Sequence, residues 1–497
     1  MRRLVDPVTP SYRWWLLGVT SIGALLSALT SGSLVIALPD ILRDLHTDLF
    51  AVMWIIVGYT LVLTVLVLNA GRVADRFGRA RTFTLGSAAF TLASVFCALA
   101  PDANTLIAGR VAQGIGAAFM FANSSALVTD AFPRRELGKA LGINAMVVGA
   151  GLIIGPILGG WLTGFGWTWV FWFNVPIGIV GTLAAALVLV EQHPAQRDVS
   201  IDWWGSALYL VALMALMTSL AFGGIYGWTT WWVIAGFILF AVVLPIFLRV
   251  ERRVRTPLLD LSLFEDRLFT LGNFTGLLNG IARYSVLFLL VFYLQGVKGD
   301  DPVTAGIELA PLAGGMLVLS PISGILADRY GSRLLATLGM VVTGIGLAGL
   351  LFIAVDTPYW QLAGWQLVIG AGAGIFNSPN TSAVMGVVPP AKRGIGAGMR
   401  SMLTSTGFII SIALAIGLIS GAMDPKVMVA VFAGTQTGSS GIDLQPFINA
   451  LHIAFGAGVL ASVVGAVISA LRGEHRSWEE TAAIEAFVRD AESGTEL

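Results

Sequence analysis

The feature that most constrains this chain is a set of long apolar runs that recur along its 497 residues. A run of about 18 or more residues is long enough for a helix to cross a hydrocarbon core about 30 Å thick. Only 12% of the residues are charged, so most of the chain has no water to face. Alternating segments typical of membrane β-strands are not evident. The sequence therefore predicts an all-α polytopic membrane protein.

The apolar runs predict about fourteen transmembrane helices. The first run is too long for the core of a signal peptide and is expected to remain as a helix. The two central runs, 204–223 and 230–249, are the weakest of the set, and an interfacial position stays open for them. The expected spans lie near 14–38, 52–70, 82–100, 105–130, 140–163, 169–190, 204–223, 230–249, 268–296, 304–325, 333–355, 361–386, 395–420 and 447–471.

Lys and Arg gather in one of the two sets of loops, which predicts the orientation. The positive-inside rule makes the richer set cytoplasmic, and an even number of helices then puts both termini in the cytoplasm. A bacterial-type plasma (inner) membrane is expected. The poorer set holds only Arg43, Lys298 and Lys426. The richer set holds Arg72, Arg76, Arg79, Arg81, Arg134, Arg135, Lys139, Arg252, Arg253, Arg255, Arg329, Arg333, Lys392 and Arg393.

An internal repeat divides the chain into two related halves. The phrase GRVADRFGRAR at 71–81 returns as GILADRYGSR at 324–333, and proline follows each copy at a similar offset, as Pro133 and Pro389. Transport folds built from repeats bind substrate between the halves and expose it to each side in turn. The expected units are an N-terminal six-helix half (1–190), two inserted helices with flanking loops (191–267), a C-terminal six-helix half (268–471) and a cytoplasmic tail (472–497).

Four stretches together resemble the motifs of one transporter family. They are the two loop phrases, RVAQGIGAA at 110–118 and GLIIGPILGG at 151–160. The resemblance is to the major facilitator superfamily, in its 14-helix drug:proton antiporter branch. It implies a major facilitator fold with two six-helix halves plus two inserted helices, and export by exchange with protons.

The family resemblance gives the loop phrases the role of a conformational latch. An acid can meet a helix terminus or an Arg, a contact worth about 0.3–1 kcal/mol when exposed and up to about 2 kcal/mol when partly buried. Such a contact, made in one conformation and broken in the other, biases an alternating equilibrium. The alternative is that these arginines only set the topology. The latch residues are Gly71, Asp75, Arg76, Gly78 and Arg79, with Asp328, Arg329 and Gly331 in the second copy.

The fifth-helix motif predicts a bent helix that packs closely on a neighbour. Proline in a membrane helix removes a backbone hydrogen bond and introduces a kink. Glycines at four-residue spacing allow close helix approach, although plain packing without a functional role is the alternative. The antiporter motif consists of Gly151, Gly155, Pro156, Gly159 and Gly160.

Three charged residues fall inside expected spans, and such charges are functional candidates by default. Glu308 is the only acid well inside a span, so it is the leading proton carrier, and Arg110 and Arg283 complete the proton-coupling set. Arg283 could bind an anionic headgroup, pair with Glu308 or face a water-filled cavity. Asp40 and Asp130, at span ends, are expected to be solvated.

The first helix departs from the family pattern. This branch usually carries an Asp seven residues before Ala-Leu-Pro, and here Thr30 occupies that position before Ala37. Polar and aromatic residues could line an apolar substrate cavity, although many of them could simply bond neighbouring helices. The cavity candidates are Thr30, Ser33, Asn123, Asn273, Asn279, Tyr284, Asn377 and Asn380.

Other classes of function find little support in the sequence. No Gly-rich loop ending in Lys-Ser or Lys-Thr is present, and the four histidines lack metal-ligand spacing. We therefore expect no enzyme activity, metal or cofactor, and the zero net charge implies no nucleic-acid partner. The sequence predicts a monomeric secondary active exporter of small lipophilic or multidrug-type solutes, using proton antiport. A lipid or lipid-linked metabolite exporter and a non-transporting membrane receptor or scaffold are the alternatives.

Overall fold

The computed structural model describes residues 9, 11–191, 202–254, 257–389, 392–422, 431–432 and 443–473. Within these residues every regular element is helical. The expected tail beyond residue 473 lies outside them. The elements that precede the inserted pair are α1 (Tyr12–Asp44), α2 (Leu49–Phe77), α3 (Arg79–Ala98), α4 (Ala103–Ala131), α5 (Arg134–Thr163), α6 (Trp169–Trp172) and α7 (Asn174–Val188).

The two weakest expected spans form full helices, α8 (Trp203–Tyr226) and α9 (Trp231–Glu251). A short 3-10 turn, η1 (Leu261–Glu265), leads from them into the second half. The remaining elements are α10 (Arg267–Phe292), the π-helical η2 (Tyr293–Lys298), α11 (Pro302–Glu308), α12 (Ala310–Tyr330), α13 (Ser332–Gly349), η3 (Leu350–Phe352), α14 (Tyr359–Gly386), α15 (Arg393–Ala422) and α17 (Gln445–Leu471).

Eleven helices of the described chain are long and apolar enough to cross a membrane. Helices α3, α5 and α14 are not among the eleven, so the count of fourteen stays a prediction. Two expected spans are interrupted where a continuous helix was predicted. The span near 169–190 divides at Phe173 into α6 and α7, and the span near 304–325 divides at Leu309 into α11 and α12.

The helix starts follow from local sequence, because aspartates cap several of them. Asp48 accepts a hydrogen bond from the Ala51 amide (2.8 Å), and Asp102 accepts one from the Thr105 amide (2.9 Å). A side-chain oxygen in this position satisfies an amide that has no partner within the helix. The acids beside the apolar runs therefore fix where these helices begin.

The repeated loop phrase gives the same backbone turn in both halves. Gly78 has φ 103° and ψ 133°, and Gly331 has φ 84° and ψ 145°. Each glycine ends one helix, and the next helix starts at the following residue. Glycine reaches positive φ without steric cost, which explains its presence at both joints.

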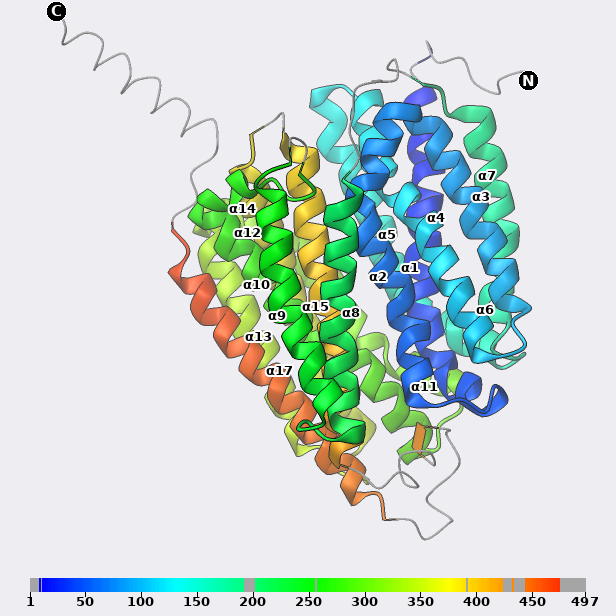
Figure 1. Cartoon of the computed structure of the whole chain (residues 1–497), viewed down its shortest axis with the longest axis vertical. Coiled ribbons are helices and arrows are strands. Elements are labelled where there is room, and N and C mark those ends of the chain that lie inside the picture. Colours follow the sequence, from blue (N-terminus) through cyan, green and yellow to red (C-terminus); the bar gives the residue numbers. More distant parts are fainter. Residues whose placement is uncertain are drawn as a thin grey trace, which may run out of the picture.

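Helix packing separates a first half, a second half and the inserted pair (Figure 1). In the first half α1 packs on α5, and α4 packs on both α2 and α3. In the second half α14 packs on both α12 and α13, and α10 packs on α15. The inserted helix α8 lies against α9 and α15 and also contacts α2. Helix α5 contacts α11, so the first and second halves meet there directly.

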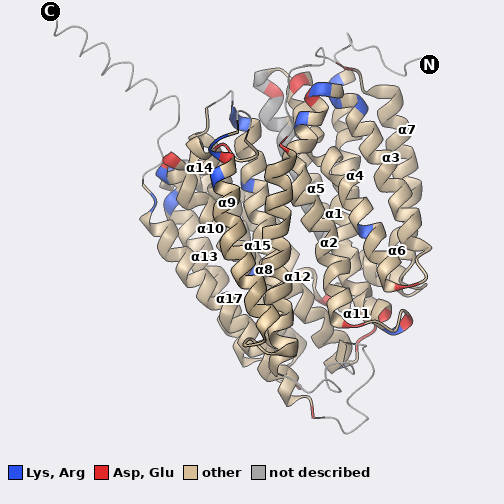
Figure 2. Cartoon of the chain, viewed as in Figure 1, with Lys and Arg blue, Asp and Glu red and all other residues tan. Residues whose placement is uncertain are grey.

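The charged residues gather mainly at one end of the helices, which also carries the N-terminal start of α1 and the end of α17 (Figure 2). We call this end the Arg-rich face, and we call the other end, beside α11, the opposite face. Most of the span between the two faces is free of charge in this view. This distribution is the pattern that separates aqueous ends from a hydrocarbon core.

Candidate transport site

The first copy of the loop motif forms a chain of three charges at the Arg-rich face. The Arg79 guanidinium lies 2.8 Å from the Asp75 carboxylate and 2.7 Å from that of Asp130. Asp130 is therefore paired, whereas the sequence predicted a solvated side chain. The three groups belong to α2, α3 and α4, so this contact joins three helices of the first half. The role of Asp75 as a latch stays a prediction.

The other latch residues differ in exposure and in packing. Arg76 is exposed and its guanidinium lies 5.6 Å from the centre of the Phe77 ring. An added Cβ at Gly71 would meet nothing within 4 Å, so packing does not require glycine there. In the second copy Arg329 is exposed and Gly331 makes the turn described above. The Asp328 side chain lies outside the described part of the structure.

Three glycines of the antiporter motif face α1 along one side of α5. An added Cβ at Gly155 would lie 3.0 Å from the Gly32 Cα, and one at Gly159 would lie 2.5 Å from the Ser33 Cα. An added Cβ at Gly151 would lie 2.8 Å from the Cβ of an α1 alanine. Since real Cβ atoms essentially never approach other atoms within 3.0 Å, the two helices lie too close for side chains at Gly151 and Gly159.

Gly160 and the backbone carbonyl of Pro156 face the second half. An added Cβ at Gly160 would lie 2.2 Å from the Pro302 carbonyl oxygen, and one at Gly306 would lie 2.5 Å from the Pro156 carbonyl oxygen. Helix α5 thus contacts α1 with one side and α11 with the other. The second contact joins the two halves at the opposite face.

Arg110 is a fully buried cation of the first half. Its Nε donates to the Ile55 carbonyl (2.9 Å), and its guanidinium lies 4.4 Å from the centre of the Tyr59 ring. A further nitrogen donates to Gln113, whose amide donates to Ser94. Among the described residues Arg110 has no carboxylate partner in an ion pair. Its contacts join α2, α3 and α4.

Arg283 and Glu308 are not brought together. The Arg283 Nε donates to Asn279 Oδ1 (3.1 Å), and its guanidinium lies 4.4 Å from the centre of the Tyr284 ring. Arg400, on α15, also acts electrostatically on Tyr284, and its own Nε is buried without a hydrogen-bond partner. Two cations of the second half therefore act on one tyrosine.

Glu308 instead pairs with an acid that the sequence reasoning missed. Its carboxyl hydrogen-bonds that of Asp300, in the loop before α11, and Lys298 lies within electrostatic range. Burial raises the pKa of Asp300, and negative Asp301 adds to this effect, whereas Lys298 opposes it. The pair is half-buried at the opposite face. The only sequence signal for this pair is that Asp300 and Glu308 lie close together along the chain, one just before and one at the end of a short helix that starts with proline.

Most of the predicted cavity residues are held in helix contacts. Thr30 donates to the carbonyl four residues earlier (2.7 Å), Asn123 bonds Thr82 (3.2 Å), and Asn380 donates to the Gly272 carbonyl (3.1 Å). The others divide between buried positions (Ser33, Asn273 and Asn279) and half-buried ones (Tyr284 and Asn377). Their role in a substrate cavity stays a prediction.

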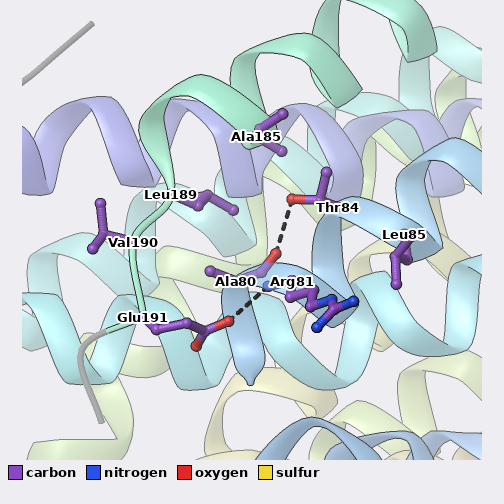
Figure 3. Close-up of a pocket in the computed structure, with 9 residues that line it drawn as sticks. Ala80, Arg81, Thr84, Leu85, Ala185, Leu189, Val190 and Glu191 are labelled. Atoms are coloured by element: carbon purple, nitrogen blue, oxygen red, sulfur yellow. Dashed lines mark hydrogen bonds between the residues drawn. The ribbon is translucent and has the colours of Figure 1, made fainter. Parts of the chain in front are cut away.

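A pocket of about 430 Å³ lies between α3 and the end of α7, at the Arg-rich face (Figure 3). The Glu191 carboxylate, which follows α7, accepts a hydrogen bond from the Arg81 backbone amide (2.8 Å). None of the predicted cavity residues lines this pocket. It lies within the first half, away from the contact between α5 and α11.

These features define a class: a multi-pass helical membrane protein with two related halves that meet through closely packed glycines. Comparison with known proteins gives the family. The model of the Major Facilitator Superfamily matches residues 20–202 and 194–412. The chain belongs to this superfamily of transporters.

Curated relatives are about one third identical to the chain over the aligned residues. Riboflavin transporter RibZ of Clostridioides difficile is 33% identical over 81% of this chain and 87% of its own length. Multidrug resistance protein Stp of Mycobacterium tuberculosis is 33% identical, over 80% of this chain and 74% of its own length. The tetracenomycin C resistance and export protein of Streptomyces glaucescens is 32% identical, over 79% and 73% respectively.

Solved structures support the fold. A bacterial homolog of the human lysosomal transporter Spinster, in an inward-facing and occupied conformation, superposes with a TM-score of 0.68. Its sequence identity is 15%, and the match covers 93% of this chain and 97% of the other. The likeness at this identity concerns the fold alone.

Proposed function

We propose that the chain is a secondary active exporter of lipophilic or multidrug-type solutes, which it exchanges for protons by alternating access. In this proposal the protein is a monomer in the plasma membrane, and the Arg-rich face with both termini is cytoplasmic. The observation that carries the proposal is the double-sided packing of α5. Its glycines fix it to α1 within the first half, and its end contacts α11 of the second half.

The contact between α5 and α11 acts as a seal in this scheme. Gly160 faces Pro302 and Gly306 faces Pro156 with room for no side chain, so solutes cannot pass between these backbones while the contact persists. Gln295 adds a hydrogen bond to the Ile36 carbonyl (3.0 Å) across the same two halves. Export to the outside then requires this seal to open. Multidrug resistance and export relatives favour that direction of transport.

The Asp300–Glu308 pair supplies the proton coupling. Two carboxyls that hydrogen-bond each other hold one proton between them, and a nearby cation such as Lys298 favours release. The pair is half-buried at the predicted outer face, where external protons can reach it. The Thr30 hydroxyl, at the position of the usual family acid, is bonded within its own helix and cannot take this role.

Substrate-driven proton flux in proteoliposomes tests the proposal. The probes are lipophilic dyes of positive, zero and negative charge, and proton movement is recorded with a trapped pH indicator. Glu308→Gln should bind the transported dye with little change but lose most of the dye-driven proton flux. Asp356→Asn, which changes an exposed acid in the loop before α14, is the matched control and should behave like wild type.

Two results would contradict the proposal. Wild-type proton flux in Glu308→Gln would place the carrier elsewhere. An absence of dye-driven flux in the wild-type protein, across the whole panel, would favour the receptor or scaffold alternative.

Arg283 and Arg400 favour a second candidate, the export of an anionic lipid or lipid-linked metabolite. The Arg283 guanidinium lies 4.4 Å from the centre of the Tyr284 ring, Arg400 acts electrostatically on the same tyrosine, and neither has a carboxylate ion-pair partner among the described residues. An anionic headgroup would compensate this charge. Arg283→Ala should then lower transport of anionic probes relative to cationic ones, whereas an equal effect on both would argue against the second candidate.

A further inference from the structure

Two acids are buried where the inserted helices meet the first half. Asp202 caps the start of α8 and is 5% exposed, and Glu251 is the last residue of α9 and is 2% exposed. Across the described residues, these are the only acidic side chains in the buried class. Neither belongs to the antiporter motif, the loop motif or the Asp300–Glu308 pair.

The geometry brings the two carboxyls into contact. They hydrogen-bond each other, and both reach the same point beside Gly205. An added Cβ at Gly205 would lie 2.3 Å from Glu251 Oε1 and 2.5 Å from Asp202 Oδ2. The outer two oxygens are already used: Asp202 Oδ1 accepts from the Gly205 amide (2.7 Å), and Glu251 Oε2 accepts from the Leu259 amide (2.8 Å).

The two inner oxygens, Oδ2 and Oε1, have no donor from any other described group. Two ionised carboxylates in contact repel each other, and burial increases that repulsion because water is excluded. A single proton placed between the inner oxygens removes the repulsion and supplies the missing donor. The contact therefore requires one proton for two carboxyls.

The elements next to the pair carry charged residues at three places. Arg72, on α2, acts on both acids and also donates to the Pro257 carbonyl. Arg252 and Arg253 follow Glu251 in the chain but are exposed. Helix α15 also packs on α8, and its Arg393 is exposed as well. With one proton bound, the two acids carry a single negative charge, which Arg72 balances.

Helix α8 also packs on α2 beside this pair of acids. The Asn69 amide donates to the Asp202 carbonyl (3.0 Å) and to the Ser206 hydroxyl (2.7 Å). Asn69 and Arg72 lie within two turns of Asp75, the acid of the first loop motif. The pair is thus connected through short contacts to the end of α2 that carries the loop motif.

We propose that Asp202 and Glu251 form a proton-binding site that fixes the inserted helices to the end of α2. On release, the O–H bond of one carboxyl breaks, the proton passes to water at the Arg-rich face, and two carboxylates remain. Their repulsion separates α8 from α9 and loosens the contact with α2. The link to transport rests on the proposed exchange function, whereas proton binding itself does not.

Infrared titration and thermal unfolding of the purified full-length protein in lipid nanodiscs test the site. Wild type should lose a protonated-carboxyl C=O band as the pH rises, and Glu251→Gln should lack that band. Asp202→Asn, which keeps a capping oxygen for α8, should lack it too. Glu265→Gln, an exposed acid on the same side, is the control and should keep the band.

The unfolding temperature gives an independent reading. The folded pair holds a proton that separate acids of the unfolded chain release, so folding takes up a proton and wild-type stability should fall as pH rises. Glu251→Gln carries a permanent donor to Asp202, so this decrease should be reduced or lost. A Glu251→Gln protein with the wild-type band and the wild-type pH profile would overturn the proposal.

The two proposals fail in different ways. A titrating band that requires Glu251, together with no dye-driven proton flux, would refute the exporter and leave the proton site standing. Dye-driven proton flux without such a band would refute the proton site and leave the exporter standing.

Discussion

Replacing Gly160 by Ala tests whether the contact between α5 and α11 keeps the opposite face closed. The added Cβ would lie 2.2 Å from the Pro302 carbonyl oxygen and 2.9 Å from its carbonyl carbon. Both are backbone atoms, so the helices themselves must separate by roughly 1 Å, and overpacking of this kind typically costs about 1–3 kcal/mol.

That cost falls on one conformation only, because the contact exists only while the two halves meet at this face. A difference of about 1–3 kcal/mol corresponds to an equilibrium shift of about 5- to 150-fold. The higher helix propensity of Ala, up to about 1 kcal/mol, applies to both conformations and cancels. We therefore expect Gly160→Ala to move the population away from the closed state.

The neighbouring Gly159 provides a matched control. Its added Cβ would lie 2.5 Å from the Ser33 Cα, in α1 of the same half. Gly159→Ala should therefore lower the thermal stability through a similar overpacking, without changing the balance between open and closed states. The two variants lie at adjacent positions, but Gly160→Ala disturbs a contact between the halves and Gly159→Ala disturbs a contact within the first half.

Pulsed electron paramagnetic resonance measures the result. Spin labels on cysteines at Trp161, on α5, and Ile307, on α11, use two exposed positions beside the contact, after replacement of the single native Cys97. Gly160→Ala should shift the distance distribution towards longer values, and Gly159→Ala should leave it unchanged. Equal distributions in wild type and Gly160→Ala, or equal shifts in both variants, would refute the reasoning.

Two further predictions concern the ends of the helices. Asp75→Asn removes a charge whose ion pair with Arg79 is about a third exposed, so the unfolding free energy should change by less than about 1 kcal/mol while the transport rate falls. Chemical denaturation and dye transport at matched expression measure both quantities, and an unchanged transport rate would contradict the latch role. Arg472→Met leaves two buried acceptors, Asn380 Oδ1 and the Ser332 carbonyl, without their donor (2.7 Å each), which should cost about 1–3 kcal/mol of stability. Arg267 is exposed and donates to the Leu471 carbonyl, so Arg267→Met should lower the stability by less. Equal shifts of the unfolding temperature in the two variants would argue against a structural role for Arg472.

The apolar runs were sufficient to predict where most helices lie, since length and hydropathy act locally along the chain. The repeated phrase also predicted matching structure, and Gly78 and Gly331 make the same turn. The break at Leu309 was not predictable in this way. It separates two helices whose combined length and hydropathy still look like one span. Its local cause is Pro311, at the start of α12, which has no amide hydrogen to continue the preceding helix.

The pairing of charged residues was the part of the site that could least be predicted from the sequence. Asp202 and Glu251 each border an apolar run and look like ordinary solvated ends of a span. Their contact depends on how α8 and α9 return to the same face, and no local pattern records that distance. Asp130 was expected in water for the same reason, yet it lies 2.7 Å from Arg79 of another helix.

The two loop motifs share a backbone turn. The helix that follows the turn is bound by an acidic side chain in the first half and by a basic one in the second half. In the first half Glu191, just after α7, accepts a hydrogen bond from the Arg81 amide near the start of α3. In the second half Arg472, just after α17, donates to the Ser332 carbonyl at the start of α13. Burial, with Arg333 nearby, lowers the pKa of Arg472 to about 10, so it stays charged near neutral pH.

Each of these ties lies within one half and joins the end of its last helix to the helix that follows the loop-motif glycine. A relative movement of the halves therefore leaves both ties unbroken. The contacts that such a movement must change are those between the halves, at Gly160 and Gly306 on one face. At the other face they include the packing of α2 on α15 of the second half, where an added Cβ at Gly398 would lie 2.1 Å from the Leu68 Cδ2. Rigid halves with small contacts between them allow a few side chains to decide which face is open.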